Sequence, residues 1–185
     1  LVIIGGGASG FMGAITAVRS GLRSVVILES TFKVLEKVRI SGGGRCNLTN
    51  SCWEISNLVK NYPRGEKQLI SLFNRFSTND SFDWFQKQGL ALKIEKDGRV
   101  FPVSDSSKDV IKCLTDIAKD YGVKVCTNSH VQKVIKIDNC FDLLVKGSNC
   151  YRAKNILICT GGHPSGRRLA KSLGHSIIPP VPSLF

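Results

Sequence analysis

The chain has 185 residues, of which 42% are hydrophobic and 22% are charged, and its formal net charge is +12. This composition predicts a globular domain with its own hydrophobic core and excludes wholesale disorder. No run of 18 apolar residues occurs, so we expect no membrane-spanning helix and no membrane partner.

The seven cysteines are scattered along the chain and form no C-x-x-C pair. An odd number without metal-ligand spacing disfavours a disulfide framework and a zinc site, so we expect no metal and a reducing compartment. That compartment is the cytoplasm, or an organelle such as a plastid if a transit peptide has been removed. The basic residues are spread out and not interleaved with aromatic residues, which favours a basic surface over a nucleic-acid partner.

Apolar patterns predict a strand–helix–strand unit at the start of the chain. Residues 1–4 are a continuous apolar run, residues 9–20 place apolar side chains on one helical face, and residues 25–28 are apolar again. Gly21 ends the helix between them. Elements in this order form a βαβ unit.

The rest of the chain mixes helical and strand patterns. Apolar residues at helical spacing predict three further helices, at residues 68–76, 81–88 and 106–121. The Asp97-Gly98 pair within "LKIEKDGRVF" predicts a hairpin. Alternating strands between Lys124 and Arg152 predict a small antiparallel meander, and the apolar residues 155–162 predict a strand buried on both faces.

The glycines after the first strand match G-x-G-x-x-G at Gly5, Gly7 and Gly10. Gly5 permits a tight turn, Gly7 lets the backbone approach a pyrophosphate, and Gly10 lets the helix pack closely on the strand. The phosphates would lie at the positive end of that helix. Glu29, at the end of the second strand, can accept hydrogen bonds from ribose hydroxyls. The combination predicts dinucleotide binding; the alternative is a turn that serves packing alone, with Glu29 as a solvated strand end.

A second glycine cluster lies in "ISGGGRCNLTN", residues 40–50. Its three successive glycines offer unobstructed backbone N–H groups, while Arg45 adds a positive charge and Asn47 an amide. These groups suit a second anionic or polar part of the same ligand. The "CTGG" at Cys159–Gly162 ends an apolar strand, and ligands collect at such ends in open α/β sheets.

Together these motifs resemble a known family. The opening "VIIGGGASG" with Glu29 and the later "ILICTGG" resemble flavoproteins with two dinucleotide-binding domains. The stretches "ISGGGRCNLTN", "DGRVFPVSDSS" and "LAKSLGHSIIPPVPSL" are similar to the BaiN/RdsA family of NAD(P)/FAD-dependent oxidoreductases, over nearly the whole chain. The resemblance implies an α/β fold, a Rossmann-like FAD-binding domain with a mainly parallel sheet, helices on both faces and a small antiparallel β-meander.

The resemblance also implies how FAD is held. Gly5–Gly10 would bind the pyrophosphate, Glu29 the adenosine ribose and Val131, through its backbone, the adenine. Ser41–Asn47 would run towards the flavin, and Thr160–Gly162 would return to the pyrophosphate and ribityl region. The residues expected to bind the cofactor are Gly5, Gly7, Ala8, Ser9, Gly10, Glu29, Ser30, Ser41, Gly42, Gly43, Gly44, Arg45, Cys46, Asn47, Val131, Thr160, Gly161 and Gly162. No catalytic side chain is assigned, because hydride chemistry would belong to the flavin.

The implied function is hydride transfer between NAD(P)H and an unknown small-molecule substrate through FAD. Residues 1–178 would be the N-terminal segment of the FAD-binding domain, and residues 179–185 the start of an inserted substrate domain. The loop after Gly162 is shorter than in the family, and we expect the elements that complete the FAD domain to be absent. The alternatives are a catalytically inactive dinucleotide-binding module and, less favoured, a basic nucleic-acid-associated protein.

Overall fold

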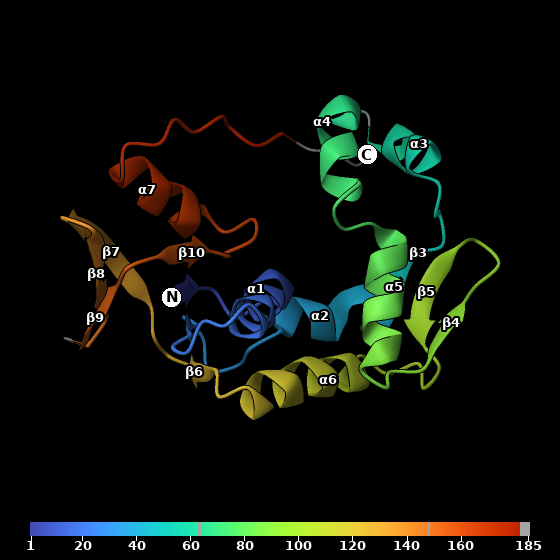
Figure 1. Ribbon diagram of the computed structural model, residues 1–185, viewed down its shortest axis with the longest axis horizontal. Helices are drawn as coiled ribbons and strands as arrows, with labels where there is room; N and C mark the ends of the chain where they lie inside the picture. The colour runs from blue at the N-terminus through green and yellow to red at the C-terminus, as the bar shows by residue number, and fades with distance from the viewer. Residues whose placement is uncertain (63, 148, 182–185) are drawn as a thin grey trace. The chain divides into compact units, whose positions relative to one another are not determined.

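The computed structural model describes residues 1–62, 64–147 and 149–181, and this part of the chain forms two compact units (Figure 1). The first unit consists of Leu1–Val38 and Leu114–Ile178. The second unit is formed by Arg39–Cys113, with the described residues from Pro179 onwards. Of the predicted start of a further domain at 179–185, residues 182–185 lie outside the described part.

A four-stranded parallel sheet is the centre of the first unit. Its strands, in spatial order, are β10 (Ile156–Ile158), β1 (Val2–Ile4), β2 (Val26–Leu28) and β6 (Lys124–Cys126). The apolar run at the start of the chain therefore occupies an interior position, paired in parallel with β10 and with β2. This arrangement confirms the Rossmann-like α/β fold predicted from the sequence.

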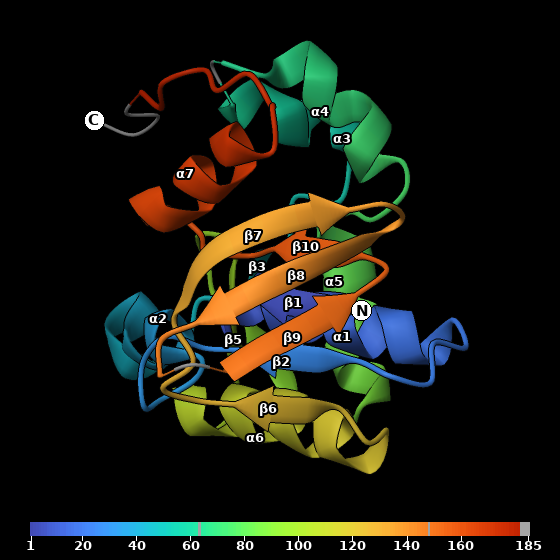
Figure 2. The same ribbon diagram turned by 90° about the vertical axis from the view of Figure 1, so that its left-hand side faces the viewer.

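Successive residues of a strand point to opposite faces of the sheet, so each strand contributes side chains to both faces. Different elements cover the two faces. Helix α1 (Ala8–Arg19) contacts β1, β2 and β10, and it buries Phe11, Ala14 and Ile15. Val2 and Ile4 pack instead into a cluster with residues of the antiparallel sheet of β7 (Val131–Ile137), β8 (Cys140–Val145) and β9 (Asn149–Ala153) (Figure 2). Leu169 of α7 (Pro164–Ser172) joins that cluster, so both faces carry a helix.

Two details of the predicted strands are wrong. The meander begins at Val131 rather than Lys124, because Lys124–Cys126 pair in parallel with β2 and belong to the main sheet. The last apolar strand, β10, is not buried on both faces: within the described residues it is an edge of the sheet, and Leu157 is 38% exposed.

The second unit combines short helices with a three-stranded antiparallel sheet. The sheet runs β3 (Thr49–Asn50), β5 (Arg99–Pro102) and β4 (Leu92–Ile94), which confirms the hairpin predicted at Asp97-Gly98. Its helices are η1 (Ser41–Gly44), α3 (Ile55–Leu58), η2 (Val59–Asn61), α4 (Glu66–Phe73) and α5 (Thr78–Lys87). Helices α2 (Glu36–Ile40) and α6 (Ser107–Asp120) run from one unit into the other.

Two negative findings apply to the described residues. None of their helices is both long enough and apolar enough to cross a bilayer. Their histidine, cysteine and acidic side chains also form no group of three that could hold a metal ion.

Candidate cofactor site

The carboxyl ends of the parallel strands meet at one edge of the first unit's sheet, and backbone hydrogen bonds join the segments that leave them. The Gly5 N–H donates to the Leu28 carbonyl at 2.9 Å, and the Cys159 N–H donates to the Ile4 carbonyl at 2.8 Å. The Ser129 N–H donates to the Glu29 carbonyl at 2.7 Å. The structure thus brings together the first glycine loop, Glu29, the segment that leads from β6 to Val131, and the "CTGG" turn. They lie at the edge where open α/β sheets bind ligands.

The three motif glycines have different physical reasons to be glycine. Gly5 has φ +112°, and a Cβ there would overlap the Cys159 carbonyl. A Cβ at Gly10 would overlap the Gly5 carbonyl, so the close contact of helix and loop requires glycine. Gly7 has φ −86° and ψ −173°, which any residue can adopt, and a Cβ there would have no atom within 4 Å. The fold itself therefore does not require glycine at position 7.

The N-terminus of α1 lies at the same edge of the sheet. Gly7 is the N-cap residue, no side chain caps the helix, and its first turn, which includes Ala8 and Ser9, contains no acidic residue. The leading N–H groups of a 12-residue helix carry a partial positive charge, and no acidic residue of the helix's own first turn offsets it. A pyrophosphate fits this cradle, because the N–H groups supply donors and Gly7 leaves the room that a side chain would fill.

Glu29 braces the glycine loop from the neighbouring strand. Its Oε2 accepts a hydrogen bond from the Gly6 N–H at 2.8 Å, and its Oε1 accepts from the N–H and hydroxyl of Thr31 at 2.8 and 2.9 Å. The Ser30 hydroxyl also donates to Oε1, at 3.2 Å. Burial acts to raise the pKa of Glu29, but these hydrogen bonds together outweigh it and hold the pKa below its usual value. Glu29 is therefore an ionised acceptor fixed beside the loop.

The remaining predicted residues of the first unit lie on the adjoining segments. Val131 is buried at the start of β7, two residues after Ser129, and a register shift follows between Val131 and Lys133. Thr160 begins the turn after β10, where its carbonyl accepts a hydrogen bond from the His163 N–H at 3.2 Å. Gly161 adopts φ +58°, so this turn also needs glycine.

One basic residue at this edge was missed by the sequence motifs. A Cβ built on Gly161 would lie 3.6 Å from Nζ of Lys37, so this ammonium group reaches the "CTGG" turn. Lys37 belongs to α2, whose start is tied to the first glycine loop by the hydrogen bond from the Leu35 N–H to the Gly6 carbonyl, at 2.8 Å. Within the described residues, Lys37 makes no ion pair or hydrogen bond. A lone lysine after an irregular turn gives no sequence signal of its own.

The predicted segment Ser41–Asn47 belongs to the second unit and forms a turn rich in left-handed backbone. Gly42, Gly43 and Gly44 have φ of +56°, +67° and +88°. A Cβ on Gly42 would lie 2.7 Å from the Asn47 nitrogen and 2.9 Å from a ring carbon of Phe101. Gly43 and Gly44 have no atom within 4 Å of a built Cβ. One side of the turn is thus packed against the unit, and the other side is open.

Cys46 closes this turn, and its residue is buried. Its N–H donates to the Ser41 carbonyl at 3.0 Å, and its backbone has φ +64°. Burial raises the pKa of the Cys46 thiol, which outweighs the opposite effect of a hydrogen bond with Ser41. The protonated thiol that results is a poor nucleophile.

Comparison with known proteins decides the family. The model of the HI0933-like protein Rossmann domain matches residues 1–181. The chain belongs to the HI0933-like family. This match confirms the family resemblance drawn from the sequence motifs.

Two curated relatives match nearly the whole of this chain. The chain is 32% identical to the 3-dehydro-bile acid delta(4,6)-reductase of Clostridium scindens and 27% identical to the ribosomal RNA dihydrouridine synthase of Haemophilus influenzae. These alignments cover 98% and 99% of this chain but 46% and 47% of the relatives. The HI0933-like chain therefore spans about half the length of the curated relatives that it matches.

A solved structure shares the fold at low sequence identity. The 3-ketosteroid-delta4-(5alpha)-dehydrogenase from Rhodococcus jostii RHA1 superposes with a TM-score of 0.66 at 14% identity, over 92% of this chain and 47% of that one. The superposition supports the Rossmann-like architecture. An identity of 14% says nothing of the substrate.

Proposed function

We propose that this HI0933-like protein binds FAD and transfers a hydride between NAD(P)H and a substrate through that flavin. The observation that carries the proposal is Gly7, a glycine that neither backbone conformation nor packing requires, at an uncapped helix N-terminus. The bound FAD would supply the hydride chemistry, and the residues of the chain would bind and orient it. The family match and the reductase among the relatives support this reading.

Each segment has a separate part in this proposal. The first-turn N–H groups of α1 bind the pyrophosphate, with Thr160–Gly162 beside them, and Glu29 accepts hydrogen bonds from the ribose hydroxyls. Val131 meets the adenine, and Ser41–Asn47 serves the flavin side. Residues 1–178 then form the N-terminal segment of an FAD-binding domain, and a further domain begins at 179.

The proposal is tested on the intact protein by its flavin. We expect the purified protein to carry, or to take up, one FAD, and we expect NADH or NADPH to bleach the flavin absorbance under anaerobic conditions. Protein that binds FAD but is reduced by neither nucleotide would instead be the inactive dinucleotide-binding module. Protein that takes up no FAD and no ADP would refute the cofactor site.

The substrate is proposed to be a small organic molecule, and RNA is the second candidate. RNA is favoured by the net charge of +12 and by the ribosomal RNA dihydrouridine synthase among the relatives. Phosphate contacts make RNA affinity fall steeply with salt. Salt-dependent RNA binding by the intact protein would favour the second candidate, and its absence at low salt would leave the small molecule.

Lys37 is predicted to contribute a positive charge to the pyrophosphate site. Replacing Lys37 by glutamine should weaken FAD and ADP binding about two- to fivefold at low salt, because an exposed charge pair is worth ~1 kcal/mol or less. The difference should disappear at about 1 M salt, where screening is nearly complete. Titration of FAD at both salt concentrations checks this.

Lys33→Gln provides the matched control for Lys37→Gln. It removes the same charge from the same segment, but the Lys33 ammonium lies over the Phe32 ring, 5.1 Å from its centroid. Equal losses of affinity in the two variants would assign the effect to net charge and not to the position of Lys37.

A further inference from the structure

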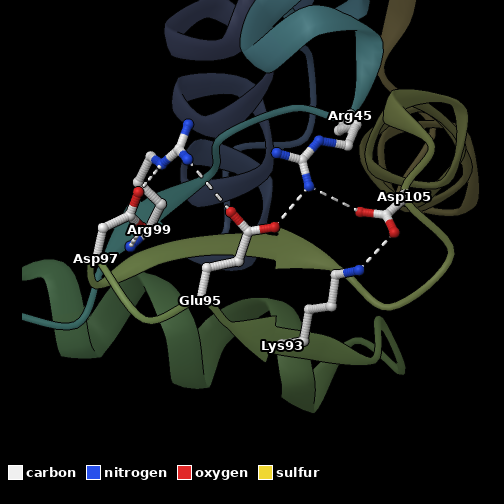
Figure 3. Close-up of polar contacts among 6 residues, drawn as sticks. All are labelled: Arg45, Lys93, Glu95, Asp97, Arg99 and Asp105. Atoms are coloured by element: carbon white, nitrogen blue, oxygen red, sulfur yellow. Dashed lines mark hydrogen bonds and ion pairs between the residues drawn. The ribbon is translucent and has the colours of Figure 1, made fainter.

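Six charged side chains of the second unit form one connected chain of ion pairs (Figure 3). In order they are Lys93, Asp105, Arg45, Glu95, Arg99 and Asp97. Arg45 lies in the middle, with Nη1 2.6 Å from Oε1 of Glu95 and 3.2 Å from Oδ1 of Asp105. The chain alternates strictly in sign, so three basic groups are balanced by three acidic groups.

The same guanidinium covers an aromatic ring of the unit's core. The Arg45 Cζ lies 3.9 Å from the centroid of Phe101, and the Phe101 residue is fully buried. The edge of that ring faces Gly42, the first glycine of the turn. Arg45 therefore joins three parts of the unit at once: its own turn, the β4–β5 hairpin through Glu95 and Phe101, and the segment after β5 through Asp105.

We infer that Arg45 is a positioning residue, which fixes the Ser41–Asn47 turn on the β4–β5 hairpin, and not the anion-binding cation that the sequence suggests. Two carboxylates already neutralise its charge, and its planar group is held between them and the Phe101 ring. The backbone of Gly43 and Gly44 lies on the open side of the turn, where it can meet a ligand. The link from this turn to the flavin rests on the proposed function; the positioning of the turn does not.

The geometry requires arginine and not simply a positive charge. A guanidinium can stack on a ring while it donates to two carboxylates, whereas an ammonium on a flexible stem cannot do both. Arg45→Lys keeps the charge and loses this geometry, so it separates the two roles. Arg45→Gln removes both.

Amide hydrogen exchange of the intact protein without added flavin tests the positioning directly. In Arg45→Lys and in Arg45→Gln, the Cys46 N–H, which is bonded to the Ser41 carbonyl, should exchange at least about tenfold faster than in the wild type. Arg99→Gln is the matched control, because it removes a cation that also pairs with Glu95 and lies over the Phe101 ring, 5.4 Å from its centroid, but that is not part of the turn. It should leave the exchange of Cys46 unchanged. Wild-type exchange at Cys46 in Arg45→Lys would overturn the inference.

FAD titration at several salt concentrations gives the second readout. If Arg45 positions the turn, both substitutions should weaken FAD binding by a similar factor, about tenfold, without changing the salt dependence of the affinity. A cation in direct contact with the ligand would behave differently: Arg45→Lys would bind almost as the wild type, and Arg45→Gln would lose part of the salt dependence. That result would also overturn the inference. If the wild type binds no FAD, the proposed function fails, while the exchange measurement still decides the role of Arg45.

Discussion

Replacing Gly7 by valine is expected to abolish FAD and ADP binding while the protein keeps its stability. The backbone of Gly7 lies in an ordinary extended conformation, and a Cβ built there has no atom within 4 Å, so neither backbone strain nor close packing opposes a side chain at this position. The same side chain would occupy the space in front of the α1 N-terminus that the pyrophosphate needs. We expect a loss of affinity of at least about a hundredfold, equivalent to ~2.7 kcal/mol, in calorimetric titrations with FAD and with ADP.

Gly10→Ala is the control that shows how the other motif glycines differ. Its added methyl group would overlap the Gly5 carbonyl, so the helix must move away from the loop. Overpacking of this kind costs about 1–3 kcal/mol of unfolding free energy. Thermal unfolding should therefore separate the two variants: Gly10→Ala should melt below the wild type, and Gly7→Val should melt with it. A stable Gly7→Val protein with unchanged affinity for ADP would contradict the site.

The parts of the fold predicted correctly from the sequence are those whose signal is local. The first βαβ unit follows from apolar runs and Gly21, and the hairpin follows from Asp97-Gly98. Strand partners are not local, which is why Lys124–Cys126 were assigned to the meander: their alternation looks the same whether they pair with β7 or with β2. The exposure of β10 depends likewise on which neighbours it has, and no residue within 155–162 encodes that.

Some missed features had a readable signal and others had none. Helix α5 begins three residues earlier than predicted, and its start is marked by Ser77 and Asp80, which form a capping box that the sequence spells out. Arg45 is different. Its partners Glu95 and Asp105 lie 50 and 60 residues away, so only the folded unit shows that its charge is already neutralised.

Glu29→Ala is expected to weaken FAD and ADP binding by about 1.5–3 kcal/mol, because a charged acceptor for the ribose hydroxyls is lost. FMN, which lacks the adenosine, should bind the Glu29→Ala protein as it binds the wild type. Part of the loss would come from the loop itself, since the Gly6 and Thr31 N–H groups would also lose their acceptor. Thr31→Val is the milder comparison: it removes the hydroxyl that donates to Oε1 and keeps the carboxylate with its two backbone donors. Its effect on ADP affinity should be small beside that of Glu29→Ala.

The ionisation of Glu29 also predicts how stability changes in acid. The folded protein holds the pKa of Glu29 below its usual value, so the carboxylate stabilises the fold fully above the unfolded pKa, about 4.3, and less as the pH falls through the lower, folded pKa. Glu29→Gln has no proton to gain there. Between neutral pH and acid, the unfolding free energy of the wild type should therefore fall more steeply than that of Glu29→Gln, with the divergence confined to the region below about pH 4.3. Parallel curves in urea titrations across this range would show that Glu29 protonates equally easily in the folded and the unfolded chain. That result would contradict the role of the Glu29 carboxylate as a hydrogen-bond acceptor for the Gly6 loop.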